Sequence, residues 1–345
     1  MFKRLLVVLA AGAVVLTAPA HAQTGKPAQQ KDSKMEKAEE AYQAMAEKRR
    51  ATESTAEKLA LTKRFLDEYP ETDRTASAIG AAFYYQGEDI GDMPGAVAYA
   101  ESVRAKIADP EIAKAVDKEM LYVYGASRMF PKMTEVAERL AAEGSLDFSD
   151  HSTIIEAATN AGEWKIALEY CGKAEPLATE ESYRKQYPDK QFKEGEIEKA
   201  VKYRAGMLLV MGGWARANLG EVDRALADFA RADKLVNRSY FDTGDFNLNL
   251  YWGEALLMKG DHRAAAEKLA ADALVMRDEK AIAGLKKAYA ATHDGEAGFD
   301  AYAAELHRSI AKSVGDFELS DYSGKRHRLS DLRKEVTLLA FWFPT

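Results

Sequence analysis

Residues 212–232 read GGWARANLGEVDRALADFARA, and residues 252–272 read WGEALLMKGDHRAAAEKLAAD. In each stretch a Gly is followed at once by an acidic residue and, five positions after the Gly, by an Ala. A Gly can end a helix in the left-handed conformation, the acidic residue favours the start of the next helix, and the small Ala lets the two helices approach closely. Each stretch therefore predicts a tight helical hairpin.

The hairpin pattern occurs four times in the chain. Its turns and small residues are Gly91-Asp92 with Ala96, Gly162-Glu163 with Ala167, Gly220-Glu221 with Ala225, and Gly260-Asp261 with Ala265. In the last two copies Gly213 and Gly253 stand seven residues before the turn, where a close crossing needs a small side chain opposite Phe229 and Leu269. These units resemble the tetratricopeptide repeat, which implies stacked helix pairs whose concave surface holds a peptide or another protein. A plain helical bundle with the same turn is the alternative.

The composition predicts a mostly α-helical chain with a helical-repeat domain over residues 35–312. The 345 residues suggest about two domains, and Ala, Glu, Lys, Leu and Arg dominate between Met35 and Lys312. Residues 65–79, FLDEYPETDRTASAI, indicate an earlier and degenerate hairpin boundary. Residues 179–200 are longer and more charged than a repeat connection, which favours a solvated insertion over an extension of the helices on one rim or a partner-facing loop. Helical spacing predicts that five aromatic residues pack in the core: Trp164, Trp214, Trp252, Tyr170 and Phe229.

Charge and motif content exclude several functions. The chain has 48 Lys+Arg against 55 Asp+Glu, a net charge of −7 with both signs scattered, so nucleic acids and anionic membranes are poor partners. The six His residues are scattered, and no Gly-rich phosphate loop or nucleophile elbow is present. We therefore predict no metal-binding, cofactor-binding or catalytic residue within the chain. Cys171 is the sole cysteine, and its place beside Tyr170 favours a buried inert thiol over a reactive or intermolecular one.

The N-terminus predicts export to the periplasm or the medium. Lys3 and Arg4 precede an apolar stretch, and Ala20-His21-Ala22 supplies the small residues of a cleavage site, as in a secretory signal peptide over residues 1–22. The apolar stretch is short for a spanning helix, which makes a retained anchor the weaker alternative. Residues 23–34, QTGKPAQQKDSK, lack large apolar side chains and predict a flexible leader.

The composition changes to strands and turns after Lys312. Phe317 to Leu319 and Arg326 to Arg328 predict a hairpin about Ser323-Gly324, Ser330 is placed to cap a short turn, and residues 336–343 predict a strand buried on both faces. Such a strand needs neighbours that residues 344–345 do not provide, so we expect residues 313–345 to be the start of a longer domain.

Residues 314–345 are similar to the opening of redoxin domains, particularly the TlpA/ResA-like thiol-disulfide oxidoreductases. The resemblance rests on four ordered elements: Gly315-Asp316-Phe317, Asp321 to Lys325, Leu329-Ser330-Asp331-Leu332, and Val336 to Trp342. It implies the first strands of a thioredoxin-like α/β domain, with Cys-x-x-Cys expected immediately after Thr345. A helix N-terminus at that place lowers a cysteine's pKa. Peroxiredoxins of the AhpC/TSA type are the near alternative, and Phe341-Trp342 favours the TlpA-like branch.

The resemblance implies an exported thiol-disulfide oxidoreductase whose helical repeats position a protein or peptide client, with a thiol or disulfide redox partner for the complete protein. Residues 1–345 precede the expected cysteines, so this chain alone is expected to be inactive. A non-enzymatic repeat scaffold is the alternative from a different functional class.

We predict that the exported protein begins at or near Gln23, because cleavage follows the small residues that end at Ala22. Intact mass of the secreted product measures this directly. A secreted product that keeps Met1 would contradict the signal peptide.

Overall fold

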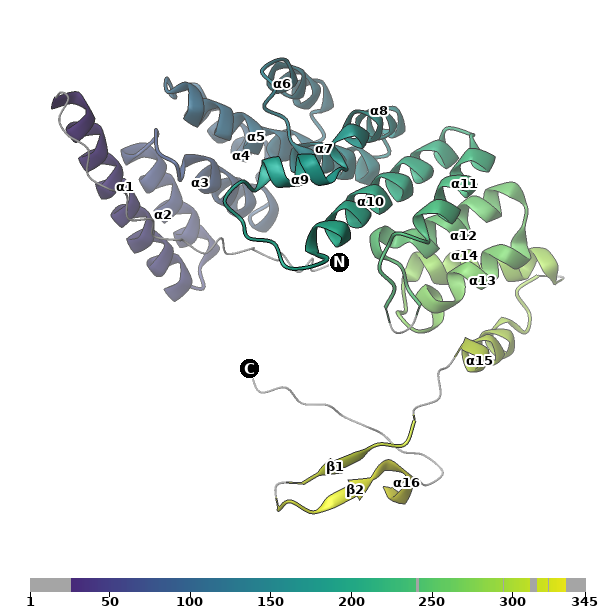
Figure 1. Ribbon diagram of the computed structural model, residues 1–345. Helices are drawn as coiled ribbons and strands as arrows, with labels where there is room; N and C mark the ends of the chain where they lie inside the picture. Colours follow the sequence, from purple (N-terminus) through teal and green to yellow (C-terminus); the bar gives the residue numbers. More distant parts are fainter. Residues whose placement is uncertain (1–25, 240–241, 294, 311–314, 322, 333–345) are drawn as a thin grey trace. The chain divides into compact units, whose positions relative to one another are not determined.

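The computed structural model describes residues 26–239, 242–293, 295–310, 315–321 and 323–332, with side chains from Met35 onward. The chain divides into two compact units, residues 1–123 and 124–345, and the division falls inside the fifth helix. Both units are predominantly helical, as the sequence predicts (Figure 1). Among the described residues, no helix combines the length and the apolar character needed to cross a membrane.

The first unit holds α1 to α4 and most of α5. Their bounds are α1 (Lys26–Ala51), α2 (Thr55–Glu68), α3 (Thr75–Phe83), the π-helical turn η1 (Tyr84–Asp89), α4 (Met93–Arg104) and α5 (Pro110–Ala126). The predicted boundary at residues 65–79 is confirmed, since α2 ends and α3 begins within it. The predicted flexible leader is helical from Lys26, because Ala, Gln and Lys favour helix. Pro27 is tolerated in the first turn, since backbone N–H groups there make no intrahelical hydrogen bond that Pro could remove.

The second unit continues with helices α6 to α15 and ends in a small hairpin. The helices are α6 (Phe130–Ala142), α7 (Phe148–Ala161), α8 (Trp164–Ala174), η2 (Glu175–Leu177), α9 (Glu180–Gln186), α10 (Glu196–Asn218), α11 (Val222–Ala232), η3 (Asp245–Asn247), α12 (Leu248–Lys259), α13 (His262–Leu274), α14 (Glu279–Thr292) and α15 (Phe299–Ile310). Figure 1 shows α10 to α14 stacked side by side, and neighbouring members of this row pack on one another.

The turns between paired helices have the predicted geometry. Each of the four turn glycines has a left-handed φ between 81° and 89°, and the four alanines that follow are at most 1% exposed. Asp92 and Asp261 cap the second helix of their pairs by accepting hydrogen bonds from Gly95 N and Ala264 N. Glu163 and Glu221 make no such bond, so among these acidic residues only the aspartates act as side-chain caps.

One turn between helices contains no Gly at its left-handed position. Arg128, between α5 and α6, has a φ of 58° and divides the interval between Gly91 and Gly162 into two nearly equal parts. Met133 stands five residues later, in the place of the usual Ala, and is fully buried. The repeat is therefore more regular than its glycines indicate, and the long interval before Gly220 contains the insertion at residues 179–200.

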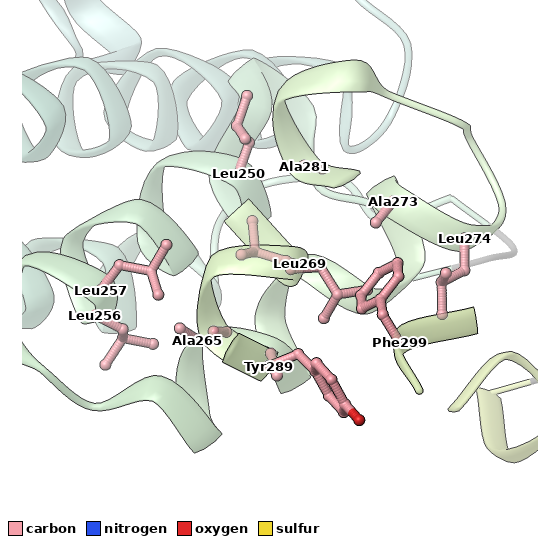
Figure 2. Packing of buried hydrophobic residues seen from close by; sticks show 13 residues of the cluster. Leu250, Leu256, Leu257, Ala265, Leu269, Ala273, Leu274, Ala281, Tyr289 and Phe299 are labelled. Atoms are coloured by element: carbon pink, nitrogen blue, oxygen red, sulfur yellow. The ribbon is translucent and has the colours of Figure 1, made fainter. Parts of the chain in front are cut away.

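The two helix glycines mark close crossings, as predicted. A Cβ atom on Gly213 would lie 3.0 Å from Cε1 of Phe229, and one on Gly253 would lie 2.5 Å from Cγ of Leu269. Leu269 also meets α14, because a Cβ on Gly284 would lie 2.9 Å from its Cδ1. Figure 2 shows Leu269 within the apolar cluster that Tyr289 and Phe299 complete.

The C-terminal hairpin forms where the sequence predicts it, with the first strand shifted by one residue. Strand β1 (Glu318–Ser320) pairs antiparallel with β2 (Arg326–Arg328), Glu318 opposite Arg328. Leu329 N also donates to Phe317 O over 2.9 Å, so the pairing extends back to the residue predicted to start it. The predicted strand at residues 336–343 lies outside the described residues.

The short helix after β2 is capped by a residue that precedes β1. Ser330, the predicted cap, lies inside α16 (Leu329–Leu332), and its backbone N and Oγ both donate to the Asp316 carboxylate. The Asp316 carboxylate therefore performs the capping role that the sequence assigned to Ser330.

We predict that Gly253→Ala lowers the free energy of unfolding by about 1–3 kcal/mol, because the added methyl overlaps Leu269. Gly172→Ala is the matched control: Gly172 is an exposed position of α8 with nothing within 4 Å of an added Cβ, so this change raises stability by about 0.5–1 kcal/mol. Chemical denaturation measures both. Equal effects at the two sites would disprove the close crossing.

Candidate functional site

The aromatic side chains predicted for the core divide into two groups. Tyr170 and Phe229 are 2% and 0% exposed, as predicted. Trp164, Trp214 and Trp252 are partly buried, and Trp214 and Trp252 pack against the buried apolar clusters, as predicted, with part of each ring left exposed.

Three partly buried rings form a continuous row over successive helix pairs. Trp164 begins α8, and its ring lies edge-on to Trp214 of α10 with the centroids 5.9 Å apart. The Trp214 ring stacks on Tyr251 of α12 at 4.6 Å, with the planes 5° from parallel. Because each ring comes from a different helix pair, the row depends on the stacking of the repeats.

A second ring pair lies on the same face of α10. Tyr203 is 48% exposed, and its ring meets that of Phe246 at 4.8 Å. Tyr203 precedes Trp214 by eleven residues, which places both on one face of the helix about 16 Å apart. We call the five residues Trp164, Trp214, Tyr251, Tyr203 and Phe246 the aromatic strip.

The floor of the aromatic strip is packed. Met207 and Val210 lie between Tyr203 and Trp214 on α10 and are 1% and 0% exposed. Phe246, Trp214 and Tyr251 all pack against the cluster that contains Val210. The rings are therefore held in place before any ligand arrives, which reduces the entropy lost on binding.

A half-buried carboxyl lies about one turn after Tyr251 on α12. Glu254 lies three residues after Tyr251, and its carboxylate reaches across to Gly284, where an added Cβ would lie 2.9 Å from Oε1. Burial raises the pKa of Glu254, while the nearby Lys287 and Lys280 lower it. Met258, on the same face of α12, is 47% exposed. Aromatic, apolar and charged groups thus adjoin one another over three helices.

Most of the insertion at residues 179–200 is exposed, as predicted for a solvated insertion, and it contains one anchored helix. Its helix α9 is held by Arg204 of α10, which is 4% exposed and donates to the carbonyl oxygen of Leu177 and to Oε1 of Gln186. The guanidinium also lies 4.6 Å from the Phe148 ring and 4.7 Å from the Tyr183 ring. Its burial lowers the pKa of Arg204, and the surrounding rings and carbonyl offset the loss of water.

Cys171 is buried, as predicted. It is 6% exposed and packs against Gly212 of α10, and burial raises the pKa of its thiol to about 12. A thiol that stays protonated at neutral pH is a poor nucleophile. This cysteine therefore behaves as a packing residue.

A carboxyl with an unusual environment lies in the first unit. Glu119 of α5 packs against Gly80 of α3, and burial raises the pKa of its side chain to about 7. Three residues later, Tyr122 donates to Glu88 of η1 over 2.7 Å. A carboxyl that exchanges its proton near neutral pH is a candidate acid–base group, and the sequence pattern alone did not single it out.

The part of the chain that the structure describes contains no group of three His, Cys, Asp or Glu side chains arranged to hold a metal ion. The one His–carboxylate contact of the C-terminal hairpin joins His327 Nε2 to Asp321 Oδ2 at 3.0 Å. Hydrogen bonds from Ser323 and then from His327 lower the pKa of Asp321. This pair stabilises the hairpin turn.

No family model matches the sequence, and no curated protein matches it. Among solved structures, the chain is similar to the crystal structure of a tetratricopeptide repeat protein from Parabacteroides merdae. The identity is 12%, the match covers 72% of this chain and 99% of that chain, and the TM-score is 0.36.

We predict that Glu119→Gln stabilises the protein at pH 8 and has little effect at pH 4. The folded-state pKa of about 7 exceeds the ordinary 4.5, so ionisation of Glu119 weakens folding progressively as the pH rises from 4.5 to 7. The variant cannot ionise, and its gain at pH 8 amounts to roughly 3 kcal/mol.

Urea unfolding at the two pH values measures this difference. The same substitution at Glu47, which is exposed on α1, serves as the control and should give equal small effects at both pH values. An effect of Glu119→Gln that does not change with pH would contradict the raised pKa.

Proposed function

We propose that this protein is a helical-repeat scaffold that binds an extended segment of a partner protein on the aromatic strip. The observation that carries the proposal is the row of Trp164, Trp214 and Tyr251 over three helix pairs. Partly exposed aromatic rings on a rigid floor are the side chains that most often dominate the binding energy of protein interfaces. A folded row of this kind offers a large apolar contact without further ordering.

The choice of an extended segment follows from the shape of the site. The Trp164, Trp214 and Tyr251 rings form a row whose consecutive centroids are 5.9 and 4.6 Å apart, which successive residues of an extended chain can follow. Glu254, which lies about one turn after Tyr251 on α12, provides a polar contact for such a segment.

A second candidate function, thiol-disulfide exchange by a longer protein, is supported by the C-terminal hairpin. Three of the four elements that resemble a redoxin domain form a compact turn in which Asp316 binds Ser330 and Asp321 binds Ser323. In this proposal the repeats present a client to cysteines that follow Thr345, in the periplasm or the medium. The codons after Thr345 test it, because they must encode Cys-x-x-Cys.

We predict that peptides selected on this protein from a random twelve-residue display library lose affinity roughly tenfold or more when Trp214 becomes Ala, since an anchoring ring is removed. Fluorescence titration of synthetic peptides measures the loss. Met276→Ala is the control, because Met276 is an exposed apolar residue outside the aromatic strip. Circular dichroism confirms that each variant is folded.

Two results would contradict the scaffold proposal. The first is a library that yields no peptide binding the folded protein. The second is a set of peptides whose affinity is unchanged by Trp214→Ala and by Tyr251→Leu.

A further inference from the structure

The two buried arginines of α10 have different partners. Arg216 pairs with the carboxylate of Asp228 on α11. Arg204 is only 4% exposed, yet both oxygens that accept hydrogen bonds from its guanidinium are neutral. Its Nη1 donates to the carbonyl oxygen of Leu177 over 3.0 Å, and its Nη2 donates to Oε1 of Gln186. A buried arginine is ordinarily paired with an anion, so the neutral acceptors of Arg204 are unusual.

The acidic side chains near Arg204 are committed to other contacts. Burial lowers the pKa of Arg204, and the nearby carboxylate of Asp147 offsets this only in part. Oδ1 of Asp147 accepts two backbone N–H groups as the cap of α7. On α9, Glu180 pairs with Arg184. The guanidinium is therefore stabilised chiefly by neutral oxygens and by ring faces.

Gln186 belongs to an exposed segment, residues 178–195, which we call the strap. The strap follows η2, contains α9 and ends at Gly195, whose φ of 72° precedes α10 (Figure 1). None of its residues is buried. Within it, the ring of Tyr183 lies 5.1 Å from that of Tyr187 and 5.6 Å from that of Phe192. The strap is thus a small unit with its own aromatic contacts.

The side chains that tie the strap to the helices behind it meet at Arg204. Besides accepting from Arg204, Gln186 donates from Nε2 to Oγ of Ser149 on α7 over 3.0 Å. The ring of Tyr183 lies 4.7 Å from the guanidinium. Closing the strap removes a cation from water, and neutral acceptors compensate for that loss only in part. Lifting the strap rehydrates the guanidinium, so it costs less free energy than separating helices packed through apolar side chains.

A carboxylate suits the place that the Gln186 amide occupies. It accepts the same N–H group and brings a negative charge, and a hydrogen bond between two ionised groups is roughly twice as strong as a neutral one. The ring of Phe148 on α7 lies 4.6 Å from the guanidinium and does not belong to the strap. A phosphate group is less suitable, because its second charge is repelled by the carboxylate of Asp147.

We propose that Arg204 is a binding position for a carboxylate side chain of a partner protein, and that the strap covers this position until Gln186 is displaced. Arg204 precedes Trp214 by ten residues on α10, about 15 Å along the helix axis. The position therefore lies apart from the row of rings. The inference goes beyond the proposed function, because Arg204 can bind a carboxylate whether or not the rings bind a segment.

The test uses a display library of twelve-residue peptides with a fixed central Glu, selected on the folded Gln186→Ala variant. Loss of the Gln186 side chain releases the strap, so this variant should bind the selected peptides about threefold to tenfold more tightly than the wild-type protein does. Synthetic peptides with Gln in place of the fixed Glu should bind the variant about tenfold more weakly. Backbone amides of α9 should exchange hydrogen faster in the variant than in the wild-type protein.

A cross-link tests the covering role of the strap. In the double variant Ser149→Cys/Gln186→Cys, a short bis-maleimide joins the strap to α7, and Cys171 does not compete because it is buried. The cross-linked protein should bind the Glu peptides at least tenfold more weakly than the same variant treated with N-ethylmaleimide. Arg204→Gln should remove the preference for Glu over Gln peptides, with circular dichroism to check its fold.

Three results would overturn the proposal: a library without binders, equal binding of Glu and Gln peptides to the Gln186→Ala variant, or equal binding by the cross-linked and N-ethylmaleimide-treated proteins. The last two measurements do not require Arg204→Gln to fold. Peptides that depend on Trp214 but not on the fixed Glu would support the proposed function and overturn the binding position at Arg204. The two proposals therefore fail separately.

Discussion

The close approach of Leu269 to two glycines is the contact on which the stacking of the second unit depends. Leu269 of α13 lies against Gly253 of α12 and Gly284 of α14, so one side chain joins three helices. A larger residue at either Gly would push a backbone away, because interiors packed at crystal density have little free volume. Phe229 and Gly213 provide the same contact one pair earlier, and Val210, Phe229 and Leu248 join α10, α11 and α12 in one buried cluster.

The aromatic strip depends on that regular stacking and on an irregular element as well. Phe246 reaches Tyr203 only because the chain before α12 adopts left-handed backbone at Phe246 and Asn247. Left-handed backbone at non-glycine residues costs about 1–2 kcal/mol each and persists where surrounding contacts enforce it. Arg204 performs a comparable task at the insertion of residues 179–200, since its buried guanidinium holds α9 against α10.

The sequence predicted much of the fold and little of the candidate site. The four turn glycines and their alanines were readable because a left-handed turn and a close crossing restrict the residue type directly. The turn at Arg128 was missed because a non-glycine residue can adopt the same backbone when neighbouring contacts hold it there. Helical periodicity placed Trp164 and Trp214 on inward faces, but it does not report how much of a large ring stays exposed, and both rings are only partly buried.

By itself, the sequence determined the local elements: where helices end, which small residues face a neighbour, and where the hairpin about Gly324 turns. These are decided by backbone conformation and side-chain size within a few residues, and the structure moves them by little. Only the tertiary structure decided which rings stack and why Glu119 lies in a buried site. Those relations join residues from different helices, and their energies depend on distance and burial, which exist only once the repeats have packed.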